Sequence, residues 1–457
     1  MKKKLIALGG VFALGVAACT SIAWYTGTLL PGRVDDLLVQ ANEQLRVALG
    51  HNGEARIELL SLDARTFGSD ARYRVTYTAA GKEPVQLEFA DRIEYGPLPW
   101  SRVKRLQLLP VMAASNLSLV ETEASAAWLA TMKHEGSLQA QLSVDYGGSI
   151  SSSVELESFG LEEGGLSVSF SGVRLYLDST KEEETARISG VVGLIRAHKK
   201  ETGITFDLKD ITVNAQLGAG ADGLRTGWVA TSASGAEARM AGRVMSLGRV
   251  TQEDTYQVAE DGYSVRQVFS ASNVRAESIS IGSARLAWRV EGLDPLAWKD
   301  FLQGPTGDDF DAVVLRLLAS NPRVALEELS LKSPRGEARA DLVAQLQSPG
   351  VEKISYDDLI GQAVGSVQAN FNVSKALIDH LGHYFETPRM QVMGWHGQRT
   401  TLWEELSAAA RSNPLLAVTD DGVLMNLRLA KPDDVELNGK KLSMDEFAEM
   451  FGQGSAH

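Results

Sequence analysis

Residues 71–77 read ARYRVTY and residues 85–89 read VQLEF, and this alternation of apolar and polar residues decides the fold class. Successive side chains of a β-strand point to opposite faces, so a period of two describes a strand with one buried face. Residues 138–146 and 284–290 repeat the pattern. The sequence therefore predicts mostly β structure, with antiparallel strands in elongated or sandwich-like sheets that dominate to about residue 290.

A change of register is expected within residues 204–217. Apolar side chains occupy even positions as far as Leu208 and odd positions from Ile211 onward. Because residues two apart share a face, both sets can face the same side only if the strand has a bulge or break near Lys209 and Asp210.

Helical spacing interrupts the strands at several places. Apolar residues recur with that spacing over 34–49, and Gly50 supplies a C-terminal stop. Asp294 and Pro295 form a typical N-cap and first turn. Further helices are expected over residues 122–133, 295–302, 308–320, 375–384, 401–411 and 445–451. The region toward the C-terminus is therefore predicted to be α+β.

The first 27 residues predict the cellular location. Three lysines at positions 2–4 precede an uncharged apolar run over residues 5–25. At about 1.5 Å per residue, a helix of this length reaches about 30 Å, the thickness of a bilayer's hydrocarbon core. With the positive charges on the cytoplasmic side, we expect one N-terminal transmembrane helix in the cell inner membrane and the bulk of the chain in the periplasm.

Two alternatives to this anchor remain open. Residues 16–19 read VAAC, so Cys19 follows small residues as at a lipoprotein processing site and is a candidate for lipidation. A cleaved signal would instead release a soluble form. The apolar run continues through Trp24 and Tyr25, which suit the membrane interface and favour the uncleaved anchor.

Composition limits the partners. Beyond residue 27 the chain contains no cysteine, so it needs no disulfide and offers no thiol nucleophile. The formal net charge is −13, and the leader lysines contribute three positive charges, which leaves −16 on the remainder. Nucleic acid and anionic lipid surfaces are therefore poor partners for the chain as a whole.

The length beyond the leader allows two or three domains, or one elongated sheet that grows by adding strands. We expect a β-rich region with a membrane-proximal helix over residues 28–160, a central antiparallel β region over 161–292 and an α+β region over 293–457, behind the anchor or signal of residues 1–27. No linker composition marks these boundaries clearly.

Three fragments, taken in order, resemble the YdgA-like family, bacterial envelope proteins whose domain has no known function. The leader ends in WYTG at residues 24–27, residues 93–99 read IEYGPLP, and residues 437–442 read LNGKKL. The second is similar to the family's Gly-Pro-Leu-Pro turn, and the third to its closing strand-turn-strand. The resemblance implies a membrane-tethered periplasmic protein and brings no catalytic residues. Physically, residues 96–99 predict a rigid strand exit and Asn438-Gly439 a two-residue hairpin.

No catalytic, cofactor or metal residue is assigned. Residues 218–223 read GAGADG and match a dinucleotide-binding fingerprint, but residues 224–229 predict a strand where that fold needs a helix, so a hairpin loop is favoured. His380 and His383 are three residues apart, whereas zinc needs three or four ligands. His396 could join them only through the fold. We therefore expect that the protein binds no cofactor and is not an enzyme.

Two functional hypotheses remain. The first is a non-enzymatic binding or scaffold protein whose sheet edges pair with other envelope proteins or with a second copy, giving a homo-oligomer. The second is a lipid- or acyl-chain-binding or transfer protein that uses an apolar β-sheet groove. A sandwich would bury the same face and leave no groove.

Overall fold

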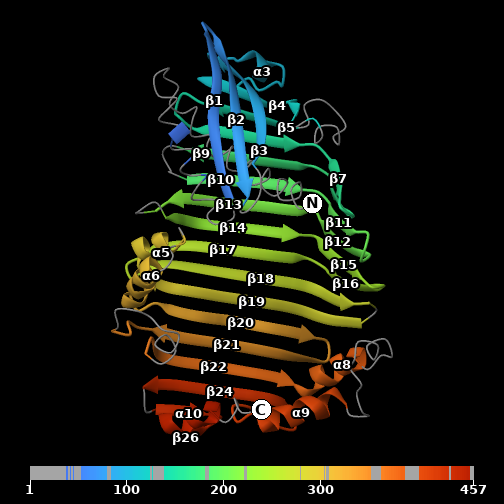
Figure 1. Cartoon of the computed structure of the whole chain (residues 1–457), viewed down its shortest axis with the longest axis vertical. Coiled ribbons are helices and arrows are strands. Elements are labelled where there is room, and N and C mark those ends of the chain that lie inside the picture. Colours follow the sequence, from blue (N-terminus) through green and yellow to red (C-terminus); the bar gives the residue numbers. More distant parts are fainter. Residues whose placement is uncertain are drawn as a thin grey trace. The chain divides into compact units, whose positions relative to one another are not determined.

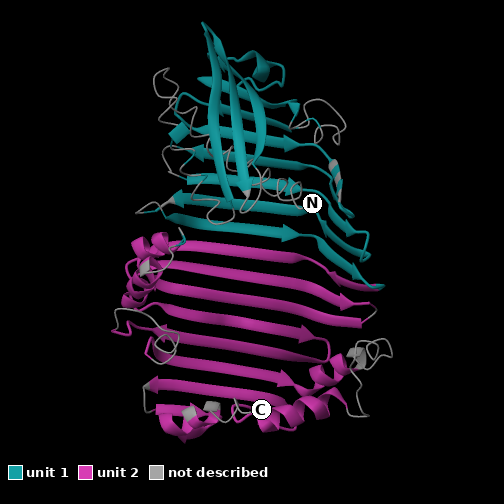
Figure 2. Cartoon of the chain, in the orientation of Figure 1, with its two compact units in different colours: residues 1–242, 302–304 teal, residues 243–301, 305–457 magenta. Residues whose placement is uncertain are grey.

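The computed structural model describes residues 38–39, 42, 45, 53–79, 84–123, 126, 138–180, 185–220, 224–277, 279–302, 304, 308–350, 362–385, 401–431 and 434–452. They form mostly antiparallel β structure with few helices (Figure 1), as the alternation predicted. The chain divides into unit 1, residues 1–242 with 302–304, and unit 2, residues 243–301 with 305–457 (Figure 2). This division falls inside the predicted region 161–292, and the predicted domain boundaries stay predictions.

The leader, including Cys19, lies outside the described residues. The anchor and its two alternatives therefore stay predictions. Among the ranges that the structure describes, no helix is long and apolar enough to cross a membrane.

Unit 1 consists of two ladders in which every pair of neighbours is antiparallel. The first joins, in order, β1 (Gly53–Arg65), β2 (Gly68–Ala79), β3 (Val85–Tyr95), β4 (Ala113–Val120), β5 (Leu138–Val144), β6 (Ile150–Leu156), β9 (Val173–Thr180), β10 (Thr185–Val192), β13 (Ile211–Ala219) and β14 (Arg225–Ala233). The second joins β7 (Phe159–Glu163), β8 (Leu166–Phe170), β11 (Ile195–Lys199), β12 (Ile204–Lys209) and β15 (Gly235–Met240). A short helix, α3 (Trp100–Val103), follows β3.

The two ladders of unit 1 meet along a line of chain breaks. β12 ends at Lys209, and Asp210, which precedes β13, has a φ of 47°. The predicted break near these two residues is therefore confirmed. Neighbouring runs break at Gly172, Gly193 and Ser234, and the Ser234 hydroxyl donates to Asp210 Oδ2 at 2.7 Å. Each break lets one run of chain supply a strand to both ladders.

The core of unit 1 lies between strands that cross. Figure 1 shows β1, β2 and β3 in front of β10 and β13, at a steep angle to them. One buried cluster contains Leu45, Ile57, Ala71, Tyr73, Val75, Tyr77 and Leu117, and a second contains Leu138, Val154, Val173, Leu175, Val192, Ile211 and Ala233. Phe89 of β3 packs against both. The first strands therefore cover the apolar face of the later ones.

Unit 2 is one antiparallel ladder, with helices at strand ends and beside its last strands. Its strands are β16 (Arg243–Leu247), β17 (Val250–Ala259), β18 (Gly262–Ala276), β19 (Ile279–Leu293), β20 (Arg323–Ser333), β21 (Gly336–Leu346), β22 (Val364–Ser374), β23 (Ala417–Val418), β24 (Gly422–Lys431), β25 (Asp434–Leu437) and β26 (Lys440–Leu442). β16 and β17 both pair with β18, and pairing then continues through β19, β20, β21, β22, β24, β25 and β26, with β23 also on β24.

The helices of unit 2 confirm the expected α+β character toward the C-terminus. They are α5 (Pro295–Leu302), α6 (Asp308–Ala319), α8 (Lys375–Phe385), α9 (Leu402–Ser412) and α10 (Met444–Gly452). Asp294 caps α5 as predicted, since its Oδ1 accepts the Ala297 N–H at 2.7 Å. Thr401 and Glu404 form a capping box at α9. The helices predicted over 34–49 and 122–133 lie largely outside the described residues.

Candidate functional site

The sheet of unit 2 has one continuous apolar face. Residues paired directly across antiparallel strands point to the same side, so the register identifies the members of each face. Leu286 pairs with Leu329, Leu329 with Ala340, Ala340 with Phe371, and Phe371 with Met425. We define the apolar face as four such rows: Ala284, Leu331, Ala338, Val373 and Val423; Leu286, Leu329, Ala340, Phe371 and Met425; Trp288, Leu326, Leu342, Ala369 and Leu427; and Val290, Val324, Ala344, Val367 and Leu429.

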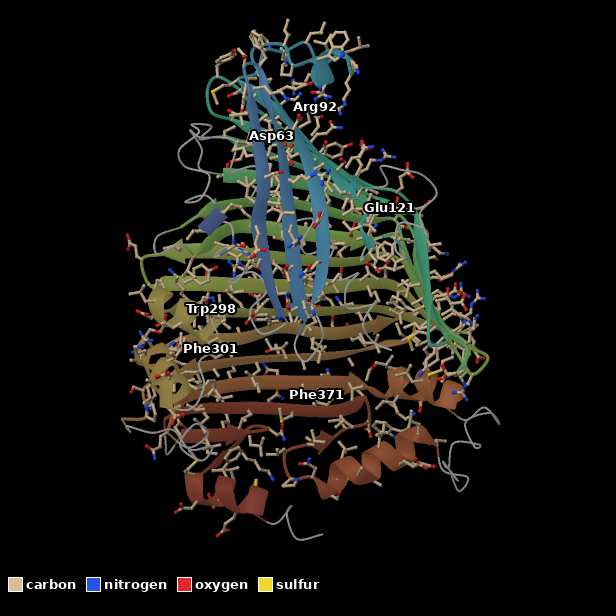
Figure 3. The ribbon with its side chains drawn as sticks, turned by 45° about the horizontal axis from the view of Figure 1, so that its top comes forward. Asp63, Arg92, Glu121, Trp298, Phe301 and Phe371 are labelled. Atoms are coloured by element: carbon tan, nitrogen blue, oxygen red, sulfur yellow. The ribbon has the colours of Figure 1, made fainter. Side chains whose placement is uncertain are left out.

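The apolar face is only partly buried. Leu329 keeps 49 % of its surface exposed, and Leu286, Phe371 and Met425 fall between buried and exposed. In the view of Figure 2, α5, α6 and α8 lie at the ends of strands, while α9 and α10 lie below β24. Figure 3 labels Phe371 on β22. An exposed contiguous apolar patch is unusual on a folded unit and indicates a binding surface.

The opposite side of the same strands is charged. Glu327, at a bulge in β20, pairs with Arg266 at 2.7 Å and with Arg289 at 2.8 Å. Glu291 receives Arg289 at 2.8 Å and Arg323 at 3.0 Å. These hydrogen-bonded guanidinium groups hold the pKa values of Glu327 and Glu291 below their usual value. Polar and apolar residues are thus separated between the two faces.

A polar ladder joins the apolar face at β17–β19. Asp254 pairs with Gln267, which in turn pairs with Trp288 of the apolar face, so all three share that side. The Gln267 amide donates to Asp254 Oδ1 at 2.7 Å, and Trp288 Nε1 donates to Gln267 Oε1 at 3.0 Å. Gln252 also donates to the Asp254 carboxylate, at 3.0 Å. The ladder places a hydrogen-bonded carboxylate beside an apolar surface.

This combination suits an amphiphile. Rows of leucine, valine and phenylalanine offer non-directional contact to an acyl chain, while Asp254 accepts hydrogen bonds and attracts a donor or cationic head group. Binding sites for small molecules are typically apolar surfaces with a few placed polar groups.

A hollow on unit 1 offers different chemistry. It measures about 650 Å³ and lies where Ser171 and Gly193 interrupt the strands. Glu155, Arg174 and Tyr176 line it, on the side of β6 and β9 opposite the buried Val173 and Leu175 cluster. Apolar residues such as Leu156 and Val191 also line the hollow, but charged residues alternate with them along the strands. The hollow therefore offers no continuous apolar row, and the apolar face of unit 2 is the stronger candidate.

The predicted loop over residues 218–223 joins two antiparallel strands. Gly220 N donates to Leu224 O at 2.8 Å at the base of the β13–β14 hairpin, and residues 221–223 lie outside the described residues. A strand therefore follows the loop, as the hairpin interpretation requires, and the helix that a dinucleotide site needs is replaced by β14.

The structure describes the side chain of only one of the two histidines of α8. His380 Nε2 lies 2.9 Å from the Ser280 backbone oxygen, and Asp379 pairs with Lys375 at 2.6 Å. The His383 side chain and His396 lie outside the described residues. In the described part of the chain, no three His, Cys, Asp or Glu side chains gather as a metal site requires.

Both predicted turns are present. Gly96, with φ of 109°, ends β3 and leads through Pro97 and Pro99 into α3. Asn438 and Gly439, with φ of 51° and 78°, connect β25 to β26 as a two-residue hairpin. The Asn438 side chain also accepts from Asn426 N at 2.8 Å.

The sequence suggested an apolar sheet groove as one hypothesis, but it identified neither the residues of the apolar face nor the polar ladder. The period of two marks the apolar residues of each strand, such as Leu286 and Trp288, but it does not say which residues of other strands lie beside them. Asp254 stands out only when its pairing with Gln267 is known. A single charged residue in the alternating set of strand positions that is otherwise apolar is the sequence signal that could have identified Asp254.

The fold and site define a non-disulfide, antiparallel β-sheet protein with a partly exposed apolar sheet face. The chain belongs to the family described as bacterial protein of unknown function (DUF945), whose model matches residues 1–445. It is 22 % identical to Protein YdgA of Escherichia coli (strain K12) over 99 % of this chain and 97 % of that protein. It is also 19 % identical to the uncharacterized protein YihF of the same strain, over 77 % of this chain and 74 % of the relative. The resemblance to the YdgA-like family is thus confirmed, and no solved structure matches the chain.

Proposed function

We propose that this protein binds the acyl chain of an amphiphile along the apolar face of unit 2, without catalysing a reaction. The observation that carries the proposal is the set of four cross-strand apolar rows from β19 to β24, in which every member except the buried Ala369 and Val423 stays at least partly exposed. Tethering to the inner membrane by residues 1–27, with the sheet in the periplasm, belongs to the same proposal and rests on the sequence of the leader.

The dimensions of the face support an acyl chain. From β18 to β24 the sheet makes five strand-to-strand steps, which at about 4.8 Å each span about 24 Å. The hydrocarbon core of a bilayer is about 30 Å thick and holds two acyl-chain lengths. One extended chain therefore fits within a row that includes Leu286, Leu329 and Phe371.

Bound lipid is the first measurement. The full chain is purified from its native membranes, extracted with organic solvent, and the extract is analysed by mass spectrometry. We expect acyl-chain material in a constant ratio to protein. Repeated absence of such material would overturn the proposal.

Paired variants then assign the site. Leu329→Gln changes the apolar face, and Arg339→Gln changes an exposed side chain on the polar side of the adjacent strand β21. We expect Leu329→Gln to weaken binding of a fluorescent fatty acid about tenfold, because burying one leucine contributes about 1.5–3 kcal/mol. Arg339→Gln should bind as the parent does. Equal effects of the two variants would place the lipid elsewhere.

The polar ladder predicts selectivity among lipid classes. Asp254→Asn keeps the size of the side chain and removes its charge, while Glu253→Gln makes the same change at an exposed position of β17. We expect only Asp254→Asn to lower the share of amine-bearing lipids in the extract. The scaffold hypothesis, with partners paired to a sheet edge, stays a prediction.

A further inference from the structure

One end of unit 1 gathers connections that are distant in sequence. In an antiparallel ladder, the turns after β1, β3 and β5 lie at the same end, and Tyr95 N donates to Phe67 O at 2.9 Å across that end. Figure 1 shows α3 and the β1–β2 turn together there, and Figure 3 turns this end forward, with Asp63 of β1 and Arg92 of β3 labelled. We call Phe67 and residues 98–109 the tip.

The tip exposes large apolar side chains. Leu106, Phe67 and Leu109 are 83 %, 81 % and 78 % exposed. Leu98, Trp100 and Leu108 are also more than half exposed. Isolated exposed leucines are common on protein surfaces, but six large apolar residues at one end form a patch of the kind that meets a partner or a membrane.

Backbone hydrogen bonds close the base of the loop that contains the tip. Gly96 N donates to Met112 O at 3.0 Å and Val111 N donates to Pro97 O at 3.1 Å, which closes the loop. Ser101 N donates to Glu94 Oε2 at 2.8 Å. The apolar side chains are therefore presented outward by a loop with a fixed base, which is the form of a compact surface loop.

Leu106 holds an unfavourable backbone conformation. Its φ is 60°, and Leu106 N and Gln107 N donate to the carbonyls of Val103 and Arg102, both at 3.0 Å, where they end α3. Glycine is the usual residue at this position of a helix end, because a side chain costs free energy there. This chain has an exposed leucine at that position. The hydrogen bonds that end α3 involve only backbone atoms, so they give no reason for a leucine side chain there.

The tip is basic in an acidic chain. Residues 98–109 contain Arg102, Lys104 and Arg105 and no Asp or Glu, although the whole chain carries −13. Lys104 Nζ lies 5.7 Å from the centroid of the Trp100 ring. The expectation that anionic lipid surfaces are poor partners rests on the net charge of the whole chain, whereas residues 98–109 carry only positive charges.

We propose that the tip docks into the interface of a lipid bilayer that contains anionic head groups. Tryptophan and leucine suit the boundary between head groups and acyl chains, and lysine and arginine are attracted to anionic lipids. The inference is independent of the apolar face of unit 2.

A local probe tests the proposal in the full chain. With Cys19 replaced by serine, Leu108→Cys gives one labelling position in the tip, and Met240→Cys gives an exposed control position at the end of β15. Each variant carries an environment-sensitive fluorophore and is reconstituted into phosphatidylcholine vesicles with and without phosphatidylglycerol, including brominated lipid. We expect quenching at position 108 only, and stronger quenching with phosphatidylglycerol.

Two further changes separate docking from folding, each in the labelled chain. Leu106→Gly relieves the backbone, so the melting temperature should rise or stay constant while quenching at position 108 falls. Lys104→Glu should weaken the docking on anionic vesicles about tenfold and leave the neutral vesicles unchanged. A label that stays in water on both vesicles, or full quenching in Leu106→Gly, would overturn the proposal. Shielding in native membranes but not on vesicles would indicate a protein partner and would also overturn it.

Discussion

Unit 1 and unit 2 use the same alternating sequence pattern but bury their apolar faces to different extents. In unit 1, Leu142, Val144 and Leu177 form a buried cluster, and Phe89 joins two larger ones. In unit 2, residues at equivalent positions of the alternation, such as Leu286 and Leu329, remain partly exposed. A period of two therefore identifies the apolar face of a strand, and burial depends on whether another layer covers it.

The largest expected effect compares one leucine in each unit. Leu142 is 4 % exposed, so Leu142→Ala should lower the free energy of unfolding by about 2–5 kcal/mol through lost burial and a cavity. Leu329→Ala should cost about 1 kcal/mol or less, because half of that side chain already faces solvent. Urea unfolding of both variants, followed by circular dichroism, measures the difference. Equal costs would show that the apolar face of unit 2 is covered as fully as the core of unit 1.

Much of the local structure was predictable from sequence. Features that depend on residues close in sequence were predicted at the correct positions. They are the strand break at Lys209 and Asp210, the helix cap at Asp294 and the hairpin at Asn438. The crossing of β1–β3 over later strands depends on contacts such as that of Phe89, which are distant in sequence. The candidate site depends on such pairing too, because Asp254 and Trp288 meet only through Gln267. Periodicity carries no information on those partners.

The second prediction concerns a carboxylate in the core of unit 1. Asp91 is buried, accepts the Ser115 hydroxyl at 2.6 Å, and burial raises its pKa to about 6 from 3.8. The folded state then binds the proton more tightly than the unfolded state. The associated stability is complete below pH 3.8 and is lost as the pH rises to about 6. Because one pKa unit corresponds to 1.36 kcal/mol, Asp91→Asn should stabilise the protein by up to about 3 kcal/mol at neutral pH.

Denaturation at several pH values measures this effect. The stability difference between Asp91→Asn and the parent should shrink as the pH falls from about 6 toward 3.8. Asp63→Asn, at an exposed position of β1, is the control and should change little. A difference that is independent of pH would show that Asp91 does not titrate as its burial implies.

The third prediction concerns a helix of unit 2. Thr401 accepts the Glu404 N–H at 3.3 Å, and Glu404 accepts the Thr401 N–H at 2.8 Å. Thr401→Ala removes the first bond and should cost about 1 kcal/mol. Thr401→Ser keeps the hydroxyl and should cost less, and thermal unfolding compares the two variants. If Thr401→Ser cost as much as Thr401→Ala, the cap would not be the source of the stability.

The smallest expected effect concerns Glu327, on the polar side of unit 2. The contribution of Glu327 to the free energy of unfolding should have the opposite pH dependence to that of Asp91. The Arg266 hydrogen bond holds the pKa of Glu327 below 4.5, so the contribution of Glu327 to stability is present above that pH and is lost as the pH falls through the lower, folded-state pKa.

Because Glu327 and both arginines are partly exposed, Glu327→Gln should cost about 1 kcal/mol or less. Unfolding at low and high salt measures that cost, which should decrease with salt as screening weakens the pairs. Glu253→Gln, at an exposed position of β17, is the control. A cost above that of Leu142→Ala would mean that ion pairs stabilise unit 2 as strongly as the core stabilises unit 1, and the contrast between the units would fail.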